Sequence, residues 1–183
     1  MLVKDIILKV CDLLEKPELA DAINSSEQLT QEQNEEVEKF VKCLNLVRNE
    51  VATEMIPNAK METILTEDGR IDFQTLSSDV IEILSVKDGM GNSINYDSFP
   101  DHILTTEGKV KIKYNASPEE LNYSSEFSST LPQRVWAYGV VREYYFIQSL
   151  YQDASVWDER FKNSIQALTS KKSETVIPRR RWE

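Results

Sequence analysis

The side chains that could support catalysis or metal binding are few and far apart in this sequence. The chain has one histidine, His102, and two cysteines, Cys11 and Cys43. A catalytic triad or a zinc site built on His102 would need partner residues at a readable spacing, and the sequence offers none, so we interpret it as a histidine at a strand edge. The two cysteines do not form a Cys-x-x-Cys pair and both fall in predicted helices. This favours buried free thiols and a reducing compartment.

Two further patterns could indicate chemistry but have simpler explanations. Gly89-Met90-Gly91 is not followed by the Gly-Lys of a phosphate-binding loop, and no predicted helix starts there, so it indicates a turn. The acidic run from Glu32 to Glu38 is typical of a solvated helix face. We therefore expect no enzymatic activity, no cofactor and no metal site.

The most distinctive segment is the C-terminal stretch 173–183, which we call the arm. It has no helical period, and three adjacent arginines precede a penultimate tryptophan. Arginine and tryptophan often anchor protein interfaces, and an apolar extended segment before them favours docking into a groove on another chain. The alternative is a disordered basic tail. The predicted partner-binding residues are Val176, Ile177, Pro178, Arg179, Arg180, Arg181 and Trp182.

The composition fits a soluble globular protein and limits its partners. The 183 residues are 40% hydrophobic and 28% charged, enough for one domain with a sizeable core or one domain with an insertion. The net charge is −10, but residues 171–183 carry +3, which leaves −13 on the remaining 170 residues. An acidic body does not bind nucleic acid by counterion release; it favours a passage to which DNA should not adhere. No segment approaches about 18 apolar residues, so we expect neither a signal peptide nor a membrane span.

Four segments have the apolar periodicity of helices: residues 3–14, 30–55, 133–151 and 155–171. The third is apolar nearly all round, which predicts a central position, whereas the fourth places its apolar side chains on one face. The connection 152–154 is so short that these two helices must be antiparallel neighbours. The residues expected in the core are Phe40, Leu44, Trp136, Tyr144, Ile147, Trp157, Phe161 and Ile165.

The expected ends of the first two helices follow from local signals. Pro17 ends the first helix, and residues 18–28 are predicted to be a polar connection. Thr30 and Gln33 have the spacing of a capping box, which predicts the start of the long second helix.

Residues 59–115 have β-type patterns instead. An Asp68-Gly69 turn between two apolar runs in residues 61–76 predicts a hairpin. Residues 109–114 alternate strictly, which predicts a strand with lysines on one face and a covered face formed by Val110, Ile112 and Tyr114.

Together these segments predict a mainly α fold with a β insertion: a four-helix bundle interrupted by a small antiparallel β block and followed by an extended arm. The expected domains are a helical bundle of residues 1–58 and 130–172, an antiparallel β insertion of residues 59–115, a loop of residues 116–129 and a docking arm of residues 173–183.

The element order over most of the chain, together with three C-terminal segments, resembles the head–tail connector (adaptor) proteins of tailed bacteriophages. The segments are Tyr144–Tyr151, Trp157–Ile165 and Ile177–Trp182. The resemblance implies a virion protein without enzymatic activity, made in the host cytoplasm and located in the neck. It implies a ring of about twelve copies below the portal, held by contacts between neighbouring copies. The arm would dock on the portal, and the β region would point toward the tail or the next neck protein.

Charge is compatible with this resemblance at two points. An acidic body suits a lumen through which double-stranded DNA passes without specific binding, and a cationic, aromatic arm suits an acidic or grooved neighbour. A second hypothesis of another class remains: a non-enzymatic soluble binding module whose basic aromatic C-terminal tail is a peptide ligand for another protein.

Overall fold

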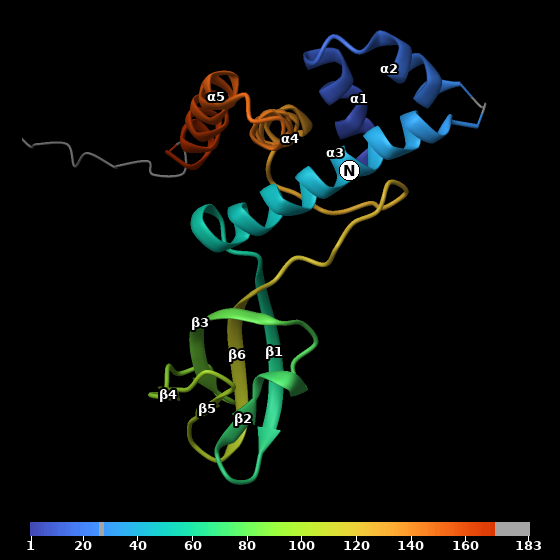
Figure 1. Ribbon diagram of the computed structural model, residues 1–183. Coiled ribbons are helices and arrows are strands. Elements are labelled where there is room, and N and C mark those ends of the chain that lie inside the picture. The colour runs from blue at the N-terminus through green and yellow to red at the C-terminus, as the bar shows by residue number, and fades with distance from the viewer. Residues whose placement is uncertain (26–27, 171–183) are drawn as a thin grey trace, which may run out of the picture. The chain divides into compact units, whose positions relative to one another are not determined.

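The computed structural model describes residues 1–25 and 28–170, and this part of the chain has a mixed α/β architecture (Figure 1). It forms two compact units, one of residues 1–47 with residues 121–170 and the other of residues 48–120. The helices are α1 (Val3–Leu13), α2 (Pro17–Asn24), α3 (Gln31–Glu50), α4 (Gln133–Ile147) and α5 (Tyr151–Ser170). None of the helices in the described residues is both long and apolar enough to cross a membrane.

The start of the first unit contains a helix, α2, where the sequence predicted only a polar connection. Pro17 is the first residue of α2, a position where its fixed φ is favourable and its missing N–H is not needed. Between α1 and α2 the chain turns at Glu15, which has a φ of +54°, and the Lys16 N–H donates to the Cys11 carbonyl at 2.9 Å. Pro17 therefore ends α1 and also begins the next helix.

The start of α3 confirms the predicted capping box. The Thr30 N–H donates to Gln33 Oε1 at 2.9 Å, and the Gln33 N–H donates to Thr30 Oγ1 at 3.3 Å. These reciprocal bonds satisfy two of the N–H groups that a helix start leaves without helical partners. The expected continuation to Met55 is also present, but residues Val51–Met55 form a π-helical turn rather than a regular α-helix.

α4 and α5 are consecutive helices that pack against each other, but the turn between them lies earlier than predicted. α4 ends at Ile147 and α5 begins at Tyr151, so the connection is residues 148–150 rather than 152–154. Ser149 has a φ of +59°, and the Leu150 N–H donates to the Tyr145 carbonyl at 2.9 Å, which completes a helix-ending motif usually made by glycine. The apolar pattern continues through this turn and conceals it in the sequence.

Gly139 on α4 lies at a close contact between helices of the first unit. A Cβ at this position would lie 2.6 Å from Val47 Cγ1 on α3 and 3.1 Å from Phe161 Cε2 on α5. Glycine therefore lets α4 contact both neighbouring helices at one point, consistent with the central position predicted for this helix.

The predicted core residues of the first unit do not all share one environment. Trp157 is only partly buried, and so is Tyr144, whose ring centroid lies 5.3 Å from that of Phe40. Ile147 is 58% exposed, so its assignment to the core was wrong. It is the last residue of α4, just before the turn that leads to α5. The remaining five are buried: Phe40, Leu44, Trp136, Phe161 and Ile165.

Six strands of the second unit form two antiparallel sheets. Their orders are β1-β6-β3 and β2-β5-β4, and both contribute to one apolar core. Val110, Ile112 and Tyr114 are buried in this core, as the alternation along the sequence predicted. The strands are β1 (Ala59–Thr66), β2 (Arg70–Asp72), β3 (Val80–Asp88), β4 (Asp97–Ser98), β5 (His102–Leu104) and β6 (Gly108–Ala116).

The predicted hairpin around Asp68-Gly69 was wrong in its pairing, although the turn exists. β1 pairs with β6 and β2 pairs with β5. Gly69 has a φ of +74°, and its carbonyl accepts a hydrogen bond from the Thr105 N–H at 2.8 Å. A Cβ on Gly69 would lie 2.2 Å from the Thr105 carbonyl oxygen. The turn therefore leads the chain from one sheet to the other instead of folding β1 back on itself.

The second unit also includes residues expected in the helical domain. The Asn115 side chain of β6 donates to the Ala52 carbonyl at 2.7 Å and accepts from the Asn58 N–H at 2.8 Å. Asn115 is 2% exposed, so these bonds satisfy a buried amide. They fix the π-helical turn to β6 within the second unit.

Candidate partner-binding surface

The predicted docking residues lie outside the described part of the chain. These are Val176, Ile177, Pro178, Arg179, Arg180, Arg181 and Trp182. The described chain leads to them through α5, which ends at Ser170.

The anchoring of α5 involves a buried arginine that the sequence reasoning missed. The Arg142 side chain on α4 is 3% exposed, and it donates to Asp158 Oδ1 at 3.0 Å and to Glu143 Oε1 at 2.7 Å. Its guanidinium carbon lies 5.0 Å from the centre of the Phe161 ring. Partial burial opposes ionisation of Asp158, but hydrogen bonds from Lys162 and Arg142 lower its pKa. The signal in the sequence was an adjacent pair of opposite charges, Arg142 and Glu143, inside a mainly apolar run.

The corner between α4 and α5 exposes a cluster of large apolar side chains, which we call the elbow: Phe146, Ile147, Leu150 and Tyr151. Each is between 41% and 64% exposed, and the rings of Phe146 and Tyr151 lie 6.3 Å apart. Single exposed apolar residues are ordinary, but four in six consecutive positions form a contiguous patch. Such a patch is typical of a surface that another chain covers.

A second surface feature, the acidic pocket, lies between α3 and the start of α2 with the turn that precedes it. It has a volume of about 600 Å³ and carries four glutamates and one lysine. Pro17 and Leu19 add apolar surface to this mainly anionic pocket. The lining residues are Glu15, Lys16, Pro17, Glu18, Leu19, Glu32, Gln33 and Glu36.

A hydrogen-bond network links the acidic pocket to α4. Lys16 Nζ lies 2.6 Å from Glu36 Oε1, and the Tyr144 hydroxyl donates to the same oxygen at 2.9 Å. Partial burial opposes ionisation of Glu36, but the bonds from Lys16 and Tyr144 lower its pKa. Burial and the bond to Glu36 both raise the pKa of Tyr144. Glu36 therefore stays ionised and joins three parts of the helical unit.

In the described residues, one group of three side chains has the spacing of metal ligands. Asp72, Asp101 and His102 offer ligand atoms within 4.8 Å of one another. However, Arg70 Nη2 lies 2.7 Å from Asp72 Oδ1 and 3.6 Å from Asp101 Oδ2, and His102 Nδ1 lies 2.7 Å from Asp101 Oδ1. The hydrogen bond with His102 lowers the pKa of Asp101. The arrangement is that of an ion-pair group holding β2 against β5, in which a guanidinium already occupies the carboxylates.

His102 lies at the end of a strand, as expected. It begins β5, the central strand of its sheet, and its ring stacks on Phe99 with centroids 4.6 Å apart and an angle of 4°. The predicted turn at Gly89-Met90-Gly91 is confirmed: it follows the end of β3, and Gly91 has a φ of +93°.

One serine of the second unit contacts a carboxylate, which raises the question of nucleophilic chemistry. The Ser77 hydroxyl donates to Glu62 Oε1 at 2.6 Å, and the Tyr114 hydroxyl donates to the same oxygen. These two bonds lower the pKa of Glu62, and a carboxylate stabilised in this way is a poor base for activating a serine. The pairing is better explained as satisfying the buried Tyr114 hydroxyl.

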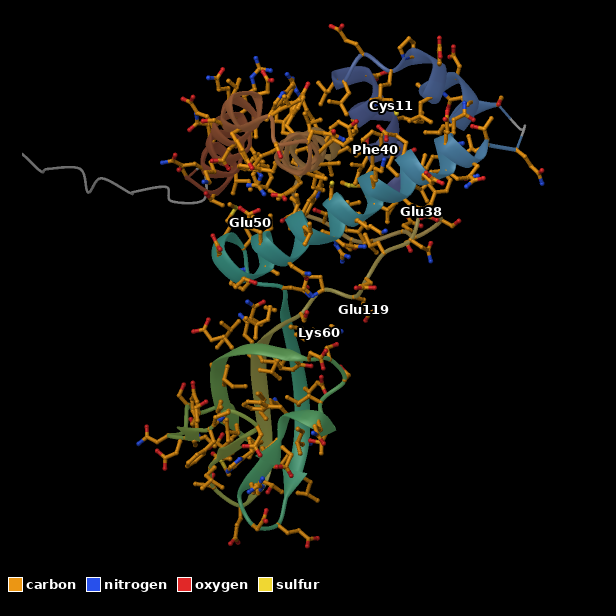
Figure 2. The ribbon with its side chains drawn as sticks, in the orientation of Figure 1. Cys11, Glu38, Phe40, Glu50, Lys60 and Glu119 are labelled. Carbon is orange, nitrogen blue, oxygen red and sulfur yellow. The ribbon has the colours of Figure 1, made fainter. Side chains whose placement is uncertain are left out.

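Both cysteines are free and buried, on α1 and α3. Burial, followed by the charge of Asp12, raises the pKa of Cys11 to about 11. Burial, followed by the charge of Glu143, raises the pKa of Cys43 to about 12. In Figure 2, Cys11 lies on α1, while Phe40 and Glu38 project from different sides of α3.

We expect Cys11 and Cys43 to resist thiol reagents in the folded protein at pH 8. A thiol with a pKa of about 11 is ionised to only about one part in a thousand at that pH, and both side chains are 0% exposed. Absorbance with a chromogenic disulfide reagent measures the reaction. A Ser155→Cys variant, exposed on α5, is the control and should react at once. Two thiols per chain reacting at the control rate would contradict the burial.

The raised pKa values of Cys11 and Cys43 also predict that the folded protein loses stability at alkaline pH. Unfolded thiols ionise near pH 9.0, whereas the folded ones stay protonated to about pH 11. Their contribution to stability is therefore fully present below pH 9.0 and is lost as the pH rises through this range.

Comparison with known proteins adds no relative to this description. No protein-family model matches the sequence, and no curated protein matches it either.

Proposed function

We propose that this chain is a structural protein of a phage virion that forms a ring below the portal and joins the head to the tail. The observation that carries the proposal is the elbow. Its residues fall within Tyr144–Tyr151, one of the segments that resembles head–tail connectors, and their apolar side chains are exposed in the single chain. A subunit that functions in a ring needs such a surface, because its neighbours cover it only after assembly.

Other features support the same proposal. In the proposed connector, α1, α3, α4 and α5 act as the four-helix bundle and α2 is an addition to it. The β unit faces the tail or the next neck protein. The acidic charge of residues 1–170 leaves double-stranded DNA free to pass through the lumen, and the arm docks on the portal. The chain carries out no catalysis in this role.

A co-assembly experiment tests this function. The purified protein is mixed with portal rings from the same virus, and native mass spectrometry counts the copies bound to each ring. We expect one discrete number of copies per portal ring, near twelve, because a closed ring cannot be partly filled without losing contacts. Absence of binding would contradict the proposal.

The same measurement separates the alternative, a soluble binding module that offers its tail as a peptide ligand. Such a module would bind independently at each site. The number of copies would then rise gradually with concentration, with partly occupied rings at every step.

A further inference from the structure

The helix α4 connects the elbow to the acidic pocket of the helical unit. Tyr144 of α4 donates its hydroxyl to Glu36, which lines the acidic pocket. Ile147 of the elbow is three residues further along α4, and residues three apart lie on the same face of a helix. Tyr144 thus connects the helix end that carries the elbow to a pocket with a surplus of carboxylates.

The sequence of the arm has the complementary chemistry in the same order. Val176 and Ile177 are apolar, and Arg179–Arg181 follow two residues later. Residues 171–183 carry a net charge of +3, and the lining of the acidic pocket, with four glutamates and one lysine, carries −3. Guanidinium groups pair with carboxylates with good geometry, so an arm seated with Ile177 on the elbow would bring its arginines toward the pocket.

The length of the chain argues that the arm comes from another copy. The elbow lies at the start of α5, whose 20 residues span about 28 Å before Ser170. Ile177 is seven residues beyond Ser170, a reach of about 25 Å only if every residue is fully extended. A chain could reach its own elbow only at this limit, with a large loss of conformational entropy, whereas the arm of a second copy has no such restriction.

We propose that the elbow and acidic pocket of one copy bind the arm of a second copy, with Ile177 on the elbow and Arg179–Arg181 facing the glutamates. The inference rests on the proposed ring and names a surface through which its neighbouring copies contact each other when the portal is absent. Because the donor and acceptor surfaces differ, the contact is heterologous, the type that closes into rings when the rotation between subunits permits.

Disulfide trapping between two variants tests this contact. An Ile147→Cys chain is mixed with an Ile177→Cys chain and oxidised, so that a mixed disulfide requires contact between copies. Cys11 and Cys43 are 0% exposed, so the native cysteines should form no disulfides between chains in this assay. The control is a Leu65→Cys chain, 76% exposed on β1, mixed with the same Ile177→Cys chain. We expect the mixed dimer in at least tenfold excess over this control on a non-reducing gel.

Charge reversal and a double variant make the result decisive. Glu18→Lys with Glu32→Lys in the acceptor chain should lower the yield of mixed dimer roughly tenfold, because two exposed carboxylates then repel the arginines. A chain carrying both Ile147→Cys and Ile177→Cys should give a ladder of oligomers. A yield equal to the control, or a double variant that closes only within its own chain, would overturn the proposal.

Attachment to the portal separates this inference from the proposed function. A Glu18→Lys, Glu32→Lys chain should lose the contact between copies but keep its elbow and its arm, and thus should still bind portal rings. If that chain binds portal rings while the disulfide trap fails, the inference is wrong and the proposed function stands. If the trap succeeds and the unmodified chain does not bind portal rings, the proposed function is wrong.

Discussion

Replacing Phe161 with alanine is expected to lower the free energy of unfolding by about 3–5 kcal/mol. Phe161 is 0% exposed on α5, and its ring lies against the point where Gly139 lets α4 approach. The substitution removes the ring and leaves a cavity, which the rigid contact between α3, α4 and α5 cannot close. It also removes the aromatic surface beneath the buried Arg142 guanidinium, whose ionic partners remain.

Urea denaturation followed by circular dichroism measures this change. Phe146→Ala is the matched control, because it makes the same chemical change at a position that is 41% exposed, and we expect it to cost less than about 1 kcal/mol. An equal loss of unfolding free energy in the two variants would mean that the buried face of α5 has been assigned wrongly.

The buried face of α5 could be predicted from spacing alone, because Phe161 and Ile165 are four residues apart and a helix places such positions on one side. The same reasoning failed at Ile147. Hydrophobic periodicity does not report where a helix ends, and Ser149 takes the left-handed conformation usually adopted by glycine. The error hid the elbow, because the predicted helix of residues 133–151 ran through its turn and placed Ile147 in the core.

The second unit shows a different limit of sequence reasoning. The alternation of β6 was readable because each strand carries its own two-residue period. The pairing of β1 with β6 joins residues such as Ala59 and Asn115, and no local signal specifies such a distant partner. The Asp68-Gly69 turn was recognised. However, the residue types of a turn predict only that the chain bends there, and they do not predict which strands pair with each other.

Polar partners inside the helical unit were equally hard to predict. Arg142 and Glu36 look in the sequence like surface charges, and only the fold shows that one is buried and the other bonds to Tyr144. Charged residues are rarely buried without a partner, so these pairs depend on which helices meet. The arm, in contrast, was singled out because its residue types are unusual beyond the last apolar stripe of the helices.

Deleting residues 174–183 is expected to abolish attachment to portal-bearing capsids and to leave the melting temperature nearly unchanged. The contacts that hold α5 involve Phe161, Ile165 and the pair of Arg142 with Asp158, all before Ser170. Burying three arginines within their own chain would cost free energy unless each found a carboxylate partner. A partner that supplies both an apolar groove and carboxylates can bury the apolar residues of the arm and pair with its arginines.

Capsid sedimentation with the bound protein quantified on gels measures attachment, and circular dichroism measures melting. A variant with Arg179, Arg180 and Arg181 replaced by lysine is the control, since it keeps the charge but loses the two-point bonding of guanidinium to carboxylate. It should attach more weakly than the natural arm and more strongly than the deletion. Normal attachment of the truncated chain would exclude the arm as the docking element, and unfolding of that chain would show that the arm belongs to the folded domain instead.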